Sequence, residues 1–180
     1  MKKDTLIAAL RLLGQSANAE GIKLEVSIYG GAAFLLAFNS RDATRDVDAI
    51  LKPREEGERL VAQVARELDI PDDWLNSNVE QFISPKQEAK RRLADIEDQT
   101  GLIVHVPTAK YLLAMKALAC RRSIGEYKGD IEDLSFLIKK IGISSVAEIQ
   151  EAVDAFYPDD LIRPGDEALL QSLIDSKDDA

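Results

Sequence analysis

Apolar and polar residues follow one another along this chain with two different periods, which predict two kinds of element. A period of two is typical of strands and predicts one over residues 24–29. Further strands are predicted over residues 46–51, 79–83 and 102–106. A period near 3.6 is typical of amphipathic helices and predicts them over residues 4–19 and 55–68. A short apolar helix is predicted over residues 32–38, and further helices over residues 108–122, 130–140 and 167–176. Asp4 is expected to cap the first helix, and Ser144 or Ser145 to cap a further one.

Strands and helices alternate up to residue 106, whereas only helices are predicted from residue 107 onward. This order favours an α+β fold, in which a small mixed β-sheet is flanked by helices and followed by a helical C-terminal part. We expect a core of residues 1–106 and a helical subdomain of residues 107–180 packed on that core. The charged segment 86–98 fits either a helix or a mobile loop.

Composition narrows the classes of function. The formal net charge is −9, which opposes extended, non-specific binding of nucleic acid because no positive field attracts the phosphates. No segment approaches the roughly 20 apolar residues of a membrane span, and the single cysteine, Cys120, excludes an internal disulfide framework. We therefore expect a cytoplasmic protein without a membrane partner. The one histidine, His105, disfavours multi-histidine metal sites.

The stretch YGGAAFLLAFNSRDATRDVDAIL is the most informative for function. Gly30 and Gly31 follow a predicted strand, and glycine lets the backbone approach a bulky anion closely. Asp46 and Asp48 are separated by one residue, so in an extended segment both carboxylates point to the same side. They would repel each other unless a cation lies between them. The spacing therefore predicts a site for Mg²⁺ (or Mn²⁺) and a nucleoside triphosphate (NTP).

The glycine pair, a helix and the pattern R-x-x-T-R-D-V-D together resemble the first motif of the nucleotidyltransferase superfamily that includes DNA polymerase β. More narrowly, the chain is similar to the AbiEii-like toxin nucleotidyltransferases of bacteria. This resemblance runs from Tyr29 to Ile138, through PDDWLN and YLLAMKALACRRSIGEYKGDIEDLSFLI. It implies a nucleotidyltransferase core in which the glycine pair contacts the triphosphate and Asp46 and Asp48 hold the metal.

Cationic side chains near the acids are candidates for contact with the phosphates. Arg41, Thr44 and Arg45 lie beside the aspartates in sequence, and arginines there can neutralise charge on phosphoryl oxygens. The alternative for the arginines is ion pairing with the neighbouring aspartates. One basic cluster, formed by Lys86, Lys90, Arg91 and Arg92, is either a solvated face or a local contact for RNA or another polyanion.

The later motifs contribute a lysine and two acids. Lys116 occurs in an otherwise apolar helical stripe, where a lysine either extends to solvent or, as the resemblance implies, reaches the triphosphate. In KGDIED, Asp130 and Asp133 suit the start of a helix. The resemblance implies instead that one of them is the base for the attacking hydroxyl, with Asp130 ahead of Asp133.

The chain departs from this family at one strand. Many polymerase-β-like enzymes carry a third metal-binding carboxylate there, whereas the predicted strand LIVHV offers His105. Either the base comes from KGDIED, or one metal ion suffices, or catalysis has been lost. The resemblance implies transfer of a nucleoside monophosphate from an NTP to a hydroxyl of RNA or protein, in a toxin that has a cognate antitoxin. The alternative is a catalytically silent binding or antitoxin-like protein with the same fold.

Overall fold

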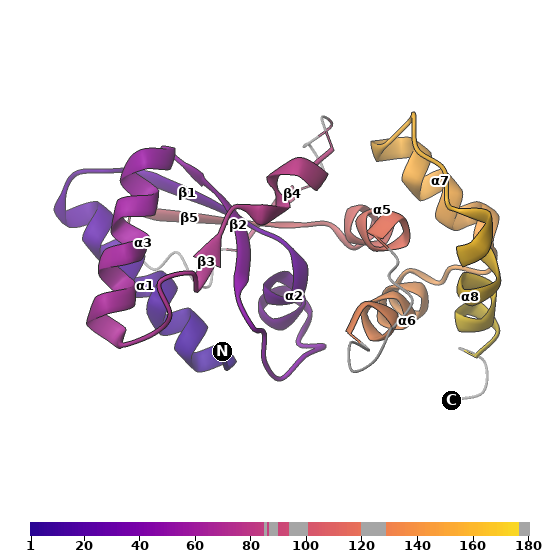
Figure 1. Cartoon of the computed structure of the whole chain (residues 1–180), viewed down its shortest axis with the longest axis horizontal. Helices are drawn as coiled ribbons and strands as arrows, with labels where there is room; N and C mark the ends of the chain where they lie inside the picture. The colour runs from indigo at the N-terminus through magenta and orange to yellow at the C-terminus, as the bar shows by residue number, and fades with distance from the viewer. Residues whose placement is uncertain (85, 87–89, 94–100, 120–128, 177–180) are drawn as a thin grey trace. The chain divides into compact units, whose positions relative to one another are not determined.

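The computed structural model describes residues 1–84, 86, 90–93, 101–119 and 129–176. The chain forms two compact units. The first comprises Met1–Gln81 and Lys90–Pro107, and the second comprises Phe82–Ala89 and Thr108–Ala180. Strands occur only in the first unit among the described residues, whereas the second is helical (Figure 1). The α+β fold predicted from the element order is confirmed.

The first unit is built on a five-stranded mixed sheet with the order β3-β2-β1-β5-β4. Its central strand, β1 (Leu24–Ile28), is antiparallel to β2 (Val47–Lys52) and parallel to β5 (Leu102–Pro107). The edges are short: β3 (Leu75–Asn76) runs parallel to β2, and β4 (Lys90–Arg92) runs antiparallel to β5. The candidate acids lie at the start of β2.

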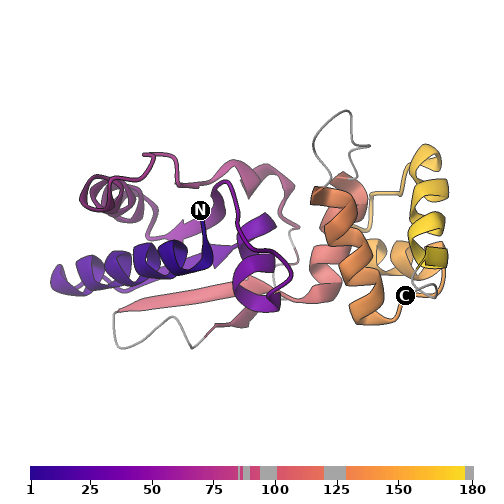
Figure 2. The same ribbon diagram turned by 90° about the horizontal axis from the view of Figure 1, so that it is seen from below.

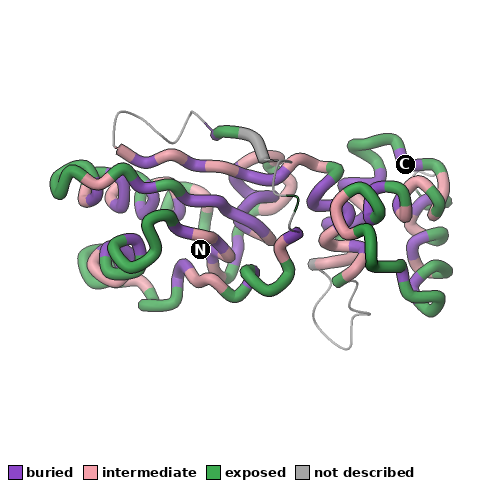
Figure 3. Tube along the Cα trace, turned by 90° about the horizontal axis from the view of Figure 1, so that it is seen from above, coloured by how far each residue is buried: buried purple, intermediate pink, exposed green. Residues whose placement is uncertain are grey.

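Helices α1 (Lys3–Ala19) and α3 (Arg54–Leu68) lie side by side and cover the sheet through contacts with β5 and β2 (Figures 1 and 2). Burial alternates along the strands, as expected for a sheet covered mainly on one face. Along β2 and β5 buried residues are separated by half-buried ones (Figure 3). The helix face of the sheet therefore holds the core, and the opposite face carries the polar side chains of β2.

Four helices form the described part of the second unit: α5 (Ala109–Ala119), α6 (Gly129–Ile141), α7 (Val146–Phe156) and α8 (Pro164–Asp175). Helix α5 contacts α6 and α7, and α6 contacts α8. The predicted cap of α7 is confirmed for Ser145, whose hydroxyl accepts a hydrogen bond from the Glu148 N–H at 3.3 Å. No helix in the described ranges is both long and apolar enough to cross a bilayer.

Two expected elements differ in the structure. The strand expected at 79–83 is a 3₁₀-helix, Asn78–Phe82, because the Asn76 side chain accepts from the Asn78 N–H at 3.0 Å and turns the chain away from the sheet. Within the charged segment 86–98, Lys90–Arg92 is a strand because it pairs with the edge of β5, and tertiary pairing overrides its weak local preference. Most of that segment lies outside the described residues.

Several element boundaries also move. Asp4 lies in the first turn of α1, which begins after Lys2 and has no side-chain cap. The short apolar helix begins at the glycine pair itself, as α2 (Gly30–Ala33), and continues as a π-helix over Phe34–Phe38. The predicted end of the helix over 108–122 and Cys120 fall outside the described residues.

Candidate functional site

The glycine pair and the second aspartate meet at the ends of β1 and β2. The Tyr29 N–H donates to the Asp48 carbonyl at 2.8 Å, which joins the chains immediately before the glycines. Gly30 has a φ of +55°, and a Cβ added to it would lie 2.7 Å from Oδ2 of Asp48. The Asp48 carboxylate therefore lies directly against the Gly30 backbone, and only glycine combines this φ with this contact.

The second glycine lies against the loop that connects the helix to β2. A Cβ on Gly31 would lie 2.8 Å from Oγ1 of Thr44 and 3.1 Å from Nη1 of Arg41. The Arg41 guanidinium also lies over the Phe34 ring, 5.8 Å from its centroid, where cation–π attraction holds it. Arg45, by contrast, is exposed and makes no ion pair within the described chain. The structure thus brings Arg41 and Thr44 to the glycine pair and leaves Arg45 outside.

Thr44 is held from both sides, which fixes the loop. Its hydroxyl donates to the Asp46 carbonyl at 2.9 Å, and its N–H donates to the Met1 carbonyl at 2.9 Å. The N-terminal amine of Met1 donates in turn to the Thr44 carbonyl. Because Thr44 is only 8% exposed, these bonds are shielded from water and tie the loop to the N-terminal end of α1.

The two aspartates differ in their backbone setting. Asp46 precedes β2, which begins at Val47, where the N–H donates to the Trp74 carbonyl at 2.8 Å. The predicted strand over 46–51 is therefore displaced by one residue. Asp48 lies within the strand, opposite Asn76 of β3. The Asn76 amide donates to Oδ2 of Asp46 at 3.4 Å, so this one side chain stands beside both acids.

Asn76 is a site residue that the sequence pattern did not identify. PDDWLN carries the family resemblance, but its pattern indicates only a turn that buries Trp74. Trp74 is indeed buried, and its indole N–H donates to the Val61 carbonyl at 3.2 Å. That anchor holds the two-residue strand β3 against β2, and the pairing then places Asn76 at the acids. No local signal reveals such a contact, because it depends on which strands pair.

The donor set at this site suits a hard divalent cation. Asp46 and Asp48 are both half-buried and offer carboxylate oxygens, the ligands that Mg²⁺ prefers. No group of three or more His, Cys, Asp or Glu residues that could hold a metal occurs among the described residues. Mg²⁺ is commonly bound by one or two carboxylates together with substrate phosphates. The residues present therefore fit a cation that arrives with a triphosphate.

His105 lies on the same face of the sheet as Asp48. Ser27 of β1 is in register with both His105 and Ile50, and directly opposed residues share a face of the sheet. Asp48 is two residues before Ile50 and so points to that face as well. The strand β5 reads LIVHVP, so it places a half-buried imidazole, and no carboxylate, on the face that carries Asp48.

A second cluster of charges lies in the helical unit. Nζ of Lys116 in α5 is 2.6 Å from Oδ1 of Asp130 and 2.8 Å from Oδ2 of Asp133, both in α6. The exposed fractions of the three side chains are 15%, 20% and 2%. Lys116 does not extend to solvent but holds two carboxylates in a mostly buried ion triad. Asp130 lies in the first turn of α6, which begins at Gly129, and is not its cap.

Comparison with known proteins finds one similar solved structure and assigns the chain to no family. No family model matches the chain, and no curated protein matches it. Among solved structures, the chain is similar to an antigenic nucleotidyltransferase-like protein from Paracoccidioides brasiliensis, with a TM-score of 0.47 and 16% sequence identity. The match covers 95% of this chain and 94% of that one. A likeness at this level does not assign a function, which has to be argued from the side chains.

Proposed function

We propose that this protein is a metal-dependent nucleotidyltransferase that moves a nucleoside monophosphate from an NTP to an acceptor hydroxyl. The observation that supports the proposal most directly is the contact between the Asp48 carboxylate and the Gly30 backbone. It brings the Asp48 carboxylate, two residues after Asp46, to the first residue of a helix. Such a point suits a cation and the phosphates it accompanies.

The candidate site residues of the first unit have separate roles in this proposal. Asp46 and Asp48 would hold Mg²⁺ or Mn²⁺, which supplies charge neutralisation and orientation of the triphosphate when bound. The N–H groups of Gly30 and Gly31 begin a helical segment, so they have no intrahelical acceptor and are available to phosphate oxygens. Arg41 would add a fixed positive charge beside them.

Nucleotidyl transfer consists of one displacement at the α-phosphorus. The acceptor oxygen forms a bond to this phosphorus, the bond to the bridging oxygen of the pyrophosphate breaks, and the hydroxyl proton passes to a base. We propose Asp130 as this base, with Asp133 as the alternative. Lys116 either stays paired with these two acids or leaves them to contact the triphosphate. The ion triad supports the first of these two roles for Lys116, because both carboxylates already contact its amine.

We also propose an acceptor and a biological role for the transfer reaction. The AbiEii-like resemblance favours a toxin of a toxin–antitoxin or phage-defence system, with RNA or protein as the acceptor and a cognate antitoxin as partner. A silent nucleotidyltransferase fold is the second candidate. Its support is the strand β5, which carries His105 where a third carboxylate is expected, and the engagement of Lys116 by two acids.

A labelling experiment tests the proposal. Purified protein is incubated with Mg²⁺, each of the four α-³²P-labelled NTPs, and either total RNA or total protein as acceptor. We expect one NTP to label an acceptor, and Asp48→Asn to abolish this labelling. Asp42→Asn is the matched control, because Asp42 is an exposed acid of the same loop.

Calorimetry of NTP binding, added to the labelling experiment, distinguishes the two candidate functions. Calorimetric binding of an NTP with Mg²⁺, lost in Asp48→Asn but without labelling of any acceptor, supports the silent fold. If wild-type protein neither binds an NTP with Mg²⁺ nor labels an acceptor, both candidates are wrong.

A further inference from the structure

A cavity of about 570 Å³ lies at the outer edge of β2 in the first unit. Its floor is formed by residues 49–52 of β2, one wall by α3, and the other by β3 and the residues that follow it. Its apolar lining residues are Ala49, Ile50, Leu51, Val61, Ala62 and Leu75. We call this cavity the β2 groove. Its volume is within the range of about 300–1,000 Å³ that is typical of ligand sites.

The backbone of β2 lacks a partner strand along this groove. The Asp48 carbonyl accepts from the Tyr29 N–H, immediately after β1, whereas the Val47 N–H donates to the Trp74 carbonyl on the opposite side. Because these directions alternate along a strand, Leu51 points its N–H and C=O away from β1. The strand β3 pairs only with Val47 and Asp48, and in the described part of the chain no other strand covers Leu51 on that side. Leu51 is buried, and buried backbone groups are nearly always paired.

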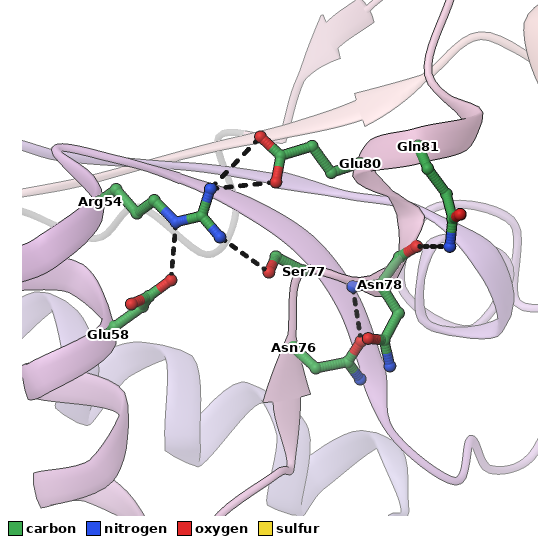
Figure 4. A network of polar contacts seen from close by, with 7 residues as sticks. All are labelled: Arg54, Glu58, Asn76, Ser77, Asn78, Glu80 and Gln81. Carbon is green, nitrogen blue, oxygen red and sulfur yellow. Dashed lines mark hydrogen bonds and ion pairs between the residues drawn. The ribbon is translucent and has the colours of Figure 1, made fainter.

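The rim of the groove is acidic. Arg54 donates to Glu58 on its own helix at 2.8 Å and reaches across to Glu80 on the opposite wall at 3.0 Å (Figure 4). These three side chains are exposed, so their pairs are weak and can be exchanged. Asp72 and Asp73 are exposed and make no ion pair with other described residues. Four carboxylates and two cations line the groove in all.

We propose that the β2 groove binds an extended segment of a partner protein as an added strand. The unpaired edge at Leu51 supplies main-chain hydrogen bonds, which give affinity in this mode of recognition. The apolar lining accepts every second side chain of the added strand, which gives specificity. The acidic rim selects a segment that carries lysine or arginine. Beside residues 49–52 there is room for about four residues of an added strand, because a strand rises roughly 3.3 Å per residue. Asp46 and Asp48 do not line the groove, although Asn76 beside them does, and the proposal does not rest on the proposed transfer reaction.

Phage-displayed random octapeptides, selected on the full chain, test this proposal. We expect the selected peptides to alternate apolar and polar residues and to carry at least one lysine or arginine. The strongest peptide is then synthesised, both unmodified and with alternate backbone nitrogens methylated. Methylation removes the donors of an added strand and leaves the side chains in place, so we expect it to weaken binding at least about tenfold, the loss of one or two hydrogen bonds.

Amide hydrogen exchange locates the bound peptide. We expect the unmodified peptide to slow exchange of the Leu51 N–H, and to leave unchanged the Ile50 N–H, which faces β1. Asp72→Asn with Asp73→Asn should weaken binding about two- to tenfold, as expected for exposed ion pairs. The matched control is Asp159→Asn with Asp160→Asn, because those exposed acids also follow a proline but belong to the second unit.

Four outcomes would overturn the proposal. No peptide is enriched, the methylated peptide binds as well as the unmodified one, the selected peptides lack a basic residue, or Leu51 is already protected in a dimer of this chain. Protection of Leu51 by an NTP alone would assign the groove to a small molecule instead. Asp46→Asn with Asp48→Asn should keep peptide binding, so failure of the transfer reaction leaves this result intact.

Discussion

Replacing Gly30 by alanine tests the central contact of the candidate site. The φ of +55° at Gly30 costs a residue with a Cβ about 1–2 kcal/mol of folding free energy. The new Cβ would also lie 2.7 Å from Oδ2 of Asp48, well inside the 3.4 Å at which ordinary contact begins, so the carboxylate has to move. Displacement of a reacting or ligand-holding group by about 1 Å costs on the order of 10²-fold in rate.

The matched control for this variant is Gly21→Ala. Gly21 has a φ of +69°, similar to that of Gly30, but an added Cβ there meets nothing within 4 Å. The free energy of unfolding, measured by urea titration, should therefore fall by a comparable amount in both variants. We expect about 1–2 kcal/mol, the cost of the left-handed backbone. Only Gly30→Ala should also lose affinity for an NTP with Mg²⁺ by calorimetry, and nucleotidyl transfer by the labelling assay.

The comparison between these two variants can refute the reasoning. If Gly30→Ala binds an NTP with Mg²⁺ within twofold of Gly21→Ala, the contact with Asp48 has no part in the site. If Gly30→Ala unfolds at the same urea concentration as wild type, the strain assigned to its backbone is wrong.

Three further predictions concern other parts of the chain. Lys116→Met should lower the free energy of unfolding by about 3–5 kcal/mol, because it removes a cation that pairs with the buried Asp133. Adding Asp133→Asn should restore part of this loss, and equal stability of the single and double variants in urea would contradict the prediction. Asn76→Ala should weaken Mn²⁺ binding about 10-fold or more, because it removes a side chain that hydrogen-bonds to a metal-binding carboxylate. Titration followed by Mn²⁺ electron paramagnetic resonance measures this binding, and unchanged binding would remove Asn76 from the site. The hydrogen bond from Arg59 lowers the pKa of Glu20 below its ordinary 4.5, so this pair stabilises the fold above that pH and its contribution is lost as pH falls through the lowered pKa. Glu20→Gln should therefore reduce the melting temperature slightly at pH 7, and the reduction should shrink progressively as pH is lowered below 4.5. A reduction that stays the same throughout such a pH series would refute the assignment.

Local patterns predicted most of the regular elements because their signals are contained within a few residues. The amphipathic spacing of 55–68 gives α3, the apolar run after residue 101 gives β5, and Ser145 caps α7 through a bond to the N–H three residues later. The prediction failed where the partner is distant in sequence. The charged Lys90–Arg92 has little tendency to form a strand alone and is one because β5 has an open edge.

For the candidate site, the sequence determined the glycine pair and the acids, since their chemistry and spacing depend on residue type alone. The tertiary structure decided which of these residues meet: Asp48 lies against Gly30, Arg41 and Thr44 lie at Gly31, and Arg45 remains in solvent. It also added Asn76, which sequence reasoning missed. These contacts join segments up to about 30 residues apart, and strand pairing, not local preference, sets their register. The same pairing left one edge of β2 open, a feature that no period or motif in the sequence records.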